Sequence, residues 1–207
     1  MGPGFRGAVV ADRAVTCYLR AMRCGWKGIS LVLALARASG ALLRVQAGEA
    51  ADLEPWKQSV RIRFPAVRQL TTTELDAWLH DTNRVSPVLL DVRTAAEFKV
   101  SHLPGAQRVD PQASVAQVWR SVPTNRPVVA YCSVGWRSSA LVERLQKAGA
   151  TNVMNLEGSI FAWANEARPL QRDGLVATNV HPYNATFGEL LRPERRSPSP
   201  APEIGGR

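Results

Sequence analysis

Short, continuously apolar runs that alternate with helical patterns constrain this fold more than any other feature of the sequence. PVLLDV at residues 87–92, PVVAYC at 127–132 and NVMNL at 152–156 are three such runs. Strands that are apolar on both faces and separated by helices are typical of a parallel sheet with helices on both sides. The sequence therefore predicts an α/β domain built on a parallel sheet.

The segments between these runs carry helical signals. TTTELDAWLH (71–80) begins with threonine cap candidates, and SSALVERLQKAG (138–149) ends at Gly149, a typical helix stop. Shorter helices are predicted at 94–98, 114–119 and 159–167.

The net charge of +9 lies mainly near the two ends of the chain. Residues 1–48 carry +6 and residues 192–207 carry +2, whereas residues 49–191 carry only +1. A nearly neutral central region argues against a broad electrostatic footprint for nucleic acid, so we expect no nucleic-acid partner.

Composition and pattern together divide the chain into five segments. We expect a leader that is a targeting segment or a disordered extension, an N-terminal extension, the α/β domain, a C-terminal extension that packs on it, and a disordered tail rich in Pro, Ser, Gly and Arg. Their ranges are 1–48, 49–69, 70–170, 171–191 and 192–207.

The leader leaves the location of the protein open. It could be a secretory signal that starts at Met22, with an apolar core at 29–36 and a small-residue cleavage site at 45–47. Its many arginines and single acid also suit a mitochondrial transit peptide, and a disordered leader without an address is the third possibility. Cytoplasmic, exported and organellar locations all remain. The apolar run is too short to span a bilayer, so no transmembrane segment is predicted.

The three cysteines are Cys17, Cys24 and Cys132, and this odd number does not indicate a disulfide framework. Cys17 and Cys24 lack metal-ligand spacing, and a zinc site needs about four ligands. We therefore expect no metal site and no cofactor.

Cys132 ends an apolar run and precedes a helix, at the strand end where ligands bind in an open parallel sheet. The pattern predicts that the helix starts about six residues later, with its N-terminus directed at the sulfur, where its N–H groups and dipole favour an anion. Gly135 permits a tight turn, and Arg137 adds a positive charge. Each effect lowers a thiol pKa and favours the nucleophilic thiolate. The alternative is a buried, unreactive cysteine.

Three segments resemble one known family. CSVGWRS (132–138) is similar to the active-site loop C-x-x-G-x-R-S of single-domain rhodaneses, which are sulfurtransferases. LLDVRTAAEFKVSHLPGA (89–106) resembles the family's D-V-R segment with its acidic-aromatic pair and H-[IL]-P-G-A turn. NLEGSIFAWANEARPL (155–170) resembles the closing N-L-x-G-G-x-x-x-W segment. The matches cover about residues 70–170, in the family's order.

The resemblance implies a five-stranded parallel sheet flanked by helices on both faces, in three layers. It implies that Cys132 takes a sulfane sulfur from a small donor such as thiosulfate, forms a persulfide and passes the sulfur to a thiol or cyanide acceptor. The acceptor could also be a protein. The backbone amides of residues 133–137 would cradle the sulfur. The implied substrate-binding residues are Ser133, Val134, Gly135, Trp136, Arg137 and Ser138.

Residues outside the loop receive supporting roles. Asp91 and Arg93 follow a strand at the same edge, and a structural ion pair is favoured over substrate contact because buried charges usually pair. Glu97 and His102 are also expected to be structural, since His102 precedes a Pro-Gly turn. Trp136 could line a pocket mouth or pack on the surface.

Two departures from the family pattern are serines in place of glycines. The glycine before the family's histidine is Ser101, and the second glycine of the closing motif is Ser159. Both side chains are small, so we expect the turns to form with little strain and neither position to take part in the chemistry of the nucleophile. No role is predicted for His181.

Other functions remain as alternatives. Phosphatases and arsenate reductases of the same fold resemble Cys-x5-Arg, whereas four residues separate Cys132 from Arg137, and a shorter loop favours a single sulfur over a phosphoryl group. A sulfur-carrier or regulatory module without turnover would keep the fold, but inactive relatives usually lack the cysteine.

Overall fold

The computed structural model describes residues 49–122 and 125–198, so the predictions for the leader and for the tail after residue 198 lie outside the described part. Five parallel strands form one sheet in the order β1-β5-β4-β2-β3, which makes β4 the central strand. The predicted α/β fold is confirmed. The strands are β1 (Gln69–Leu70), β2 (Val88–Asp91), β3 (Gln107–Arg108), β4 (Val128–Tyr131) and β5 (Val153–Leu156).

The helices alternate with the strands as the sequence predicts. Capping boxes start α2, α3 and α4, in which the hydroxyl of Thr71, Thr94 or Ser114 accepts a backbone N–H and a Glu or Gln side chain accepts the reciprocal one. The helices are α1 (Glu54–Arg63), α2 (Thr72–His80), α3 (Ala95–Val100), α4 (Val115–Ser121), α5 (Trp136–Lys147), α6 (Ser159–Asn165) and α7 (Ala185–Gly188).

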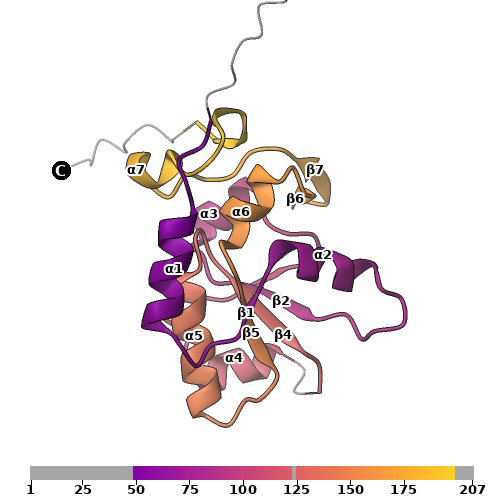
Figure 1. The fold of residues 1–207 in the computed structure, drawn as a ribbon. Helices are drawn as coiled ribbons and strands as arrows, with labels where there is room; N and C mark the ends of the chain where they lie inside the picture. Colours follow the sequence, from indigo (N-terminus) through magenta and orange to yellow (C-terminus); the bar gives the residue numbers. More distant parts are fainter. Residues whose placement is uncertain (1–48, 123–124, 199–207) are drawn as a thin grey trace, which may run out of the picture. The chain divides into compact units, whose positions relative to one another are not determined.

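Two hydrophobic clusters lie on opposite faces of the sheet, because alternate side chains of each strand point to opposite sides. On one face, Leu90 and Ala130 pack with residues of α1, α4 and α5. On the other, Leu89 and Val129 pack with residues of α2 and α6. Figure 1 shows this division, with α1 alongside α5 and with α2 and α6 on the opposite side of the strands. Burial on both faces explains why the strand sequences are continuously apolar.

The segments that flank the domain are also folded. The sequence does not predict α1, yet Val60 and Phe64 are buried against the α5 face of the sheet. After α6 the chain forms an antiparallel hairpin of β6 (Leu170–Arg172) and β7 (Leu175–Ala177), then α7 and a short 3₁₀ helix, η1 (Pro193–Arg195). In the part of the chain that the structure describes, none of the helices is both long and apolar enough to cross a membrane.

The segment 192–198, which the sequence predicts to be disordered, is instead ordered. The Val180 N–H donates to the Arg195 carbonyl oxygen at 2.7 Å, and the Ser197 N–H donates to the Val180 carbonyl oxygen at 2.9 Å. Leu190 and Leu191, just before this segment, are buried in the hydrophobic cluster of α6. The Pro- and Arg-rich composition does not reveal these backbone hydrogen bonds, because they depend on the buried residue Val180.

Candidate active site

Cys132 directly follows β4, at the carboxyl end of the central strand, and its side chain is buried with 1% exposure. Its backbone is fixed by the start of α6. The Cys132 N–H donates to Ser159 Oγ at 3.1 Å, and the Cys132 carbonyl oxygen accepts from the Ile160 N–H at 3.2 Å. The Ser133 carbonyl oxygen similarly accepts from the Phe161 N–H at 3.1 Å. The cysteine therefore has little freedom to move along the chain.

The helix after Cys132 begins earlier than the sequence predicts. Gly135 adopts the left-handed conformation (φ 105°) and is the N-cap residue of α5, so Trp136 and Arg137 already lie in the first helical turn. The sequence predicts the turn at Gly135, but not that this glycine is itself the N-cap, so the helix begins two residues before the predicted start at Ser138. The Gly135 N–H donates to Cys132 Sγ at 3.2 Å. A Cβ at Gly135 would lie 3.2 Å from Asn155 Nδ2, so the turn also sits tightly against β5.

Arg137 forms a two-point ion pair with Glu97, which is 2% exposed. Arg137 Nη1 donates to Glu97 Oε2 at 2.9 Å and Nη2 donates to Oε1 at 2.7 Å. Ser133 bridges the two, since its hydroxyl donates to Glu97 Oε1 and accepts from Arg137 Nη2, both at 3.0 Å. Burial opposes ionisation of Glu97, but Arg137 and the cap residue Thr94 lower the pKa of this carboxyl to about 2. The carboxylate therefore fixes the guanidinium beside the loop.

The thiol itself is held in an environment that favours its anion. Burial is the largest single effect and raises the pKa of Cys132. The charge of Arg137 and hydrogen bonds from Ser138 and Gly135 act in the opposite direction and together bring the pKa of Cys132 below its ordinary value. The Ser138 hydroxyl donates its proton to Asn155 Oδ1 at 2.6 Å, which ties the first turn of α5 to β5.

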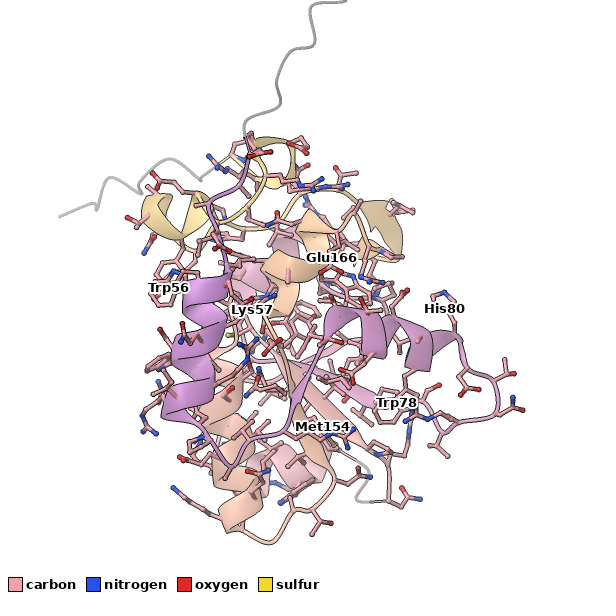
Figure 2. The ribbon with its side chains drawn as sticks, in the orientation of Figure 1. Trp56, Lys57, Trp78, His80, Met154 and Glu166 are labelled. Carbon is pink, nitrogen blue, oxygen red and sulfur yellow. The ribbon has the colours of Figure 1, made fainter. Side chains whose placement is uncertain are left out.

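A cavity of about 180 Å³ opens beside the thiol. Trp56 from α1 and Tyr183 and Phe187 from the C-terminal extension form much of its wall. The Trp56 and Phe187 rings lie 4.8 Å apart, and Figure 2 shows Trp56 on α1 next to the C-terminal extension. These aromatic residues were missed in the sequence, because nothing local links the two extensions to the loop. The other lining residues are Cys132, Ser133, Val134, Trp136 and Arg137.

Trp136 both lines the cavity and packs on the surface, the two alternatives that the sequence leaves open. It lines the cavity mouth and is 42% exposed, while its ring packs edge-on against Phe64, the residue that follows α1, with ring centroids 5.5 Å apart. Arg137 lies over the Tyr183 ring at 5.1 Å. The C-terminal extension therefore contacts the cation of the loop as well as closing the cavity.

Asp91 and Arg93 form a separate ion pair in which both side chains are fully buried. Arg93 Nε donates to Asp91 Oδ1 at 2.9 Å and Nη2 donates to Oδ2 and to the Ser101 carbonyl oxygen, each at 2.6 Å. His102 stacks on Phe98 with ring centroids 3.9 Å apart. Neither the ion pair nor His102 lines the cavity beside the thiol.

The two serines that depart from the family pattern both have defined contacts. Ser101 donates to the Asn179 carbonyl oxygen at 2.6 Å, which ties the C-terminal extension to the domain. Ser159 has φ 52°, in the left-handed region, and its hydroxyl accepts from the Cys132 N–H. The left-handed φ contradicts the expectation of a turn with little strain at Ser159, and the contact of its hydroxyl with Cys132 is to the backbone N–H of the cysteine.

Two substitutions of Ser159 are expected to show how much the backbone strain and the hydrogen bond each contribute to stability. Ser159→Ala keeps the strained Cβ and leaves the buried Cys132 N–H without its acceptor, at a cost of about 1–3 kcal/mol. Ser159→Gly loses the same hydrogen bond but releases about 1 kcal/mol of left-handed strain. Urea denaturation should therefore rank stability as wild type, then Gly, then Ala. An alanine variant as stable as the glycine variant would contradict this account.

Comparisons with known proteins point to one family. A family model described as Rhodanese-like domain matches residues 71–166. A sulfurtransferase of Allochromatium vinosum is 34% identical over 104 residues, which cover 50% of this chain and 94% of that protein. The probable adenylyltransferase/sulfurtransferase MoeZ of Mycobacterium tuberculosis is 32% identical over 102 residues, and the match spans 48% of this chain but only 25% of that protein.

Solved structures share the fold. The crystal structure of a thiosulfate sulfurtransferase from Pseudomonas aeruginosa has a TM-score of 0.50 and 22% sequence identity, over 60% of this chain and 23% of that chain. At this identity the likeness concerns the arrangement of the sheet and helices alone.

Proposed function

Because this chain belongs to the rhodanese-like domain family, we propose that it is a sulfurtransferase that uses a Cys132 persulfide. In this proposal the sulfane sulfur comes from a thiosulfate- or persulfide-type donor and goes to a thiophilic acceptor. The observation that carries the proposal is the environment of one sulfur atom. Cys132 Sγ lies at the carboxyl end of the central strand, accepts the Gly135 N–H and faces the first turn of α5.

The chemistry proceeds in two steps. The Cys132 thiolate attacks the outer sulfur of the donor, the donor's S–S bond breaks, and its electron pair leaves with the remainder of the donor. The resulting persulfide is an anion, which the N-terminus of the 12-residue helix α5 and the charge of Arg137 stabilise. A thiolate or cyanide then attacks the terminal sulfur of the persulfide, and the Cys132 thiolate leaves.

The arrangement gives less support to phosphoryl chemistry. Arg137 would have to bind the equatorial oxygens of a phosphate, but three of its five N–H groups already donate, two to Glu97 and one to Ser133. A carrier that delivers its sulfur to a protein would use the same Cys132 chemistry. It differs from the enzyme only in the acceptor.

The test is to identify the sulfur on Cys132. After incubation with thiosulfate, mass spectrometry should find one additional sulfur on the Cys132 peptide, and addition of cyanide should release it as thiocyanate. Cys132→Ser should abolish both results, because an alcohol does not replace the thiolate as nucleophile. Unmodified Cys132 after exposure to thiosulfate and to an organic persulfide would overturn the proposal. Cys132-dependent hydrolysis of an aryl phosphate would favour the phosphatase instead.

A further inference from the structure

The polar side chains of the candidate site are already paired with one another. Arg137 is the only charged residue among the described residues that line the cavity, and its guanidinium is bound by Glu97. The Ser133 hydroxyl lies between them. Lys57, next to Trp56 in the sequence, pairs with Glu54 at 3.5 Å. With Glu97 and Arg137 both ionised the pair is neutral, and the N-terminus of α5 supplies only about half of one positive charge beside the Cys132 thiolate. A donor with one negative charge is therefore repelled less than a dianion.

The cavity wall is mostly aromatic. Trp56, Tyr183 and Phe187 lie across from the loop and contact one another in pairs, with ring centroids of Trp56 and Phe187 at 4.8 Å and of Tyr183 and Phe187 at 5.3 Å. Val134 and Trp136 complete the apolar surface. Apolar pockets favour apolar ligands through the area removed from water, and aromatic rings add offset and edge-to-face contacts.

The size of the cavity suits a ring. An apolar protein cavity of about 150 Å³ is large enough to bind benzene. The cavity beside Cys132 measures about 180 Å³, so one ring fits with its reactive group directed at the thiol. A small inorganic anion would leave much of this apolar surface uncovered.

We propose that the preferred sulfur donor carries its sulfane sulfur on an apolar, aromatic body with a single negative charge, and not on an inorganic dianion. This inference rests on the proposed sulfurtransferase function. For a thiosulfonate, R–SO₂–S⁻, the Cys132 thiolate attacks the outer sulfur and the S–S bond breaks. The electron pair leaves with the sulfinate, R–SO₂⁻, and the persulfide Cys132–S–S⁻ remains, so one negative charge stays on each product.

Three sulfur donors distinguish the effect of the donor's organic group from the effect of its charge. Benzenethiosulfonate and methanethiosulfonate have the same reactive group and charge but differ in the body, whereas thiosulfate is a dianion without an organic body. Each kcat/KM is divided by the donor's rate with free cysteine to remove intrinsic reactivity. We expect the phenyl donor to exceed the methyl donor by about tenfold or more, since even one methylene in an apolar pocket gives roughly that discrimination. Equal values for the two, or a higher value for thiosulfate than for the phenyl donor, would overturn the inference.

Substitutions locate the preference in the aromatic wall. Phe187→Ala and Trp56→Ala should each lower the phenyl-to-methyl ratio several-fold. Leu175→Ala is the matched control, because Leu175 lies on β7, is 73% exposed and does not line the cavity. A ratio that is unchanged in both aromatic variants would contradict the assignment of the wall.

A binding measurement tests the preference for an aromatic ligand without requiring sulfur transfer. Benzenesulfinate and methanesulfinate are titrated into the Cys132→Ser protein, and tryptophan fluorescence reports on Trp56 and Trp136 at the cavity. Benzenesulfinate should bind at least about tenfold more tightly. Equal affinities would overturn the inference even where sulfur transfer is observed. Tight aromatic binding without any sulfur on wild-type Cys132 would retain the aromatic site and reject the proposed function.

Discussion

Replacing Asp91 with asparagine is expected to destabilise the folded protein by about 3–5 kcal/mol, because it leaves the buried Arg93 charge without its counter-ion. Both side chains are fully buried, and Asp91 accepts from Arg93 Nε, Nη2 and the backbone N–H. Asparagine keeps the size of the side chain but turns an NH₂ group toward a guanidinium that already has one buried, unpaired nitrogen, Nη1. Denaturation by urea, followed by circular dichroism, measures the loss.

A double variant shows whether the charge is the cause. Asp91→Asn combined with Arg93→Met removes the orphaned cation, so the penalty for a buried charge without a counter-ion no longer applies. The double variant should therefore be more stable than Asp91→Asn alone, although it also loses the hydrogen bond to the Ser101 carbonyl oxygen. If the two changes simply added, the ion pair would not be the source of the effect.

The sheet could be predicted from the sequence because its signals are local. The strands β2, β4 and β5 are buried on both faces and read as unbroken apolar runs, and the threonines before α2 and α3 form the capping boxes they suggest. The two-residue edge strands β1 and β3 are too short to show a pattern. They exist only because Gln69–Leu70 and Gln107–Arg108 pair with neighbours far along the chain. Helix α1 carries only three clearly apolar residues in ten, so its burial depends on the α5 face it covers.

The candidate site divides in the same way. The loop after Cys132 and its turn at Gly135 could be recognised because the residues are contiguous, but the early start of α5, which places Arg137 in the first helical turn, could not. The sequence also points to Glu97, though not to its ion pair with Arg137 across 40 positions. The aromatic wall could not be predicted, since Trp56 and Phe187 meet only after both extensions fold onto the domain.

Replacing Glu97 with glutamine is expected to lower the free energy of unfolding by about 3 kcal/mol at neutral pH. The same substitution should also slow sulfur transfer. The pair is 2.7 Å across its shorter contact and Glu97 is almost fully buried, so the variant leaves Arg137 without its counter-ion. In the proposed mechanism, transfer slows because Glu97 positions the Arg137 cation, which would stabilise the thiolate and the persulfide. The decisive comparison is with Asp91→Asn under conditions where both are folded. The catalytic constant should fall more for Glu97→Gln, and equal losses would mean that Glu97 acts only on stability.

The difference in stability between wild type and Glu97→Gln should depend on pH, and this dependence tests the same ion pair. The pKa of Glu97 is about 2 in the folded protein against an ordinary value of 4.5. A carboxyl whose pKa is lowered by folding contributes stability that is complete above the unfolded value and is lost as the pH falls toward the folded one. The stability gap between wild type and Glu97→Gln should therefore be widest near neutral pH and close between about pH 4.5 and 2. Glu143→Gln, which removes the partly exposed pair with Lys147, is the control and should show a gap of no more than about 1 kcal/mol. A gap that stayed constant down to the lowest pH would show that the variant acts through packing, because the Glu97 carboxyl is the only titrating group that differs between the two proteins.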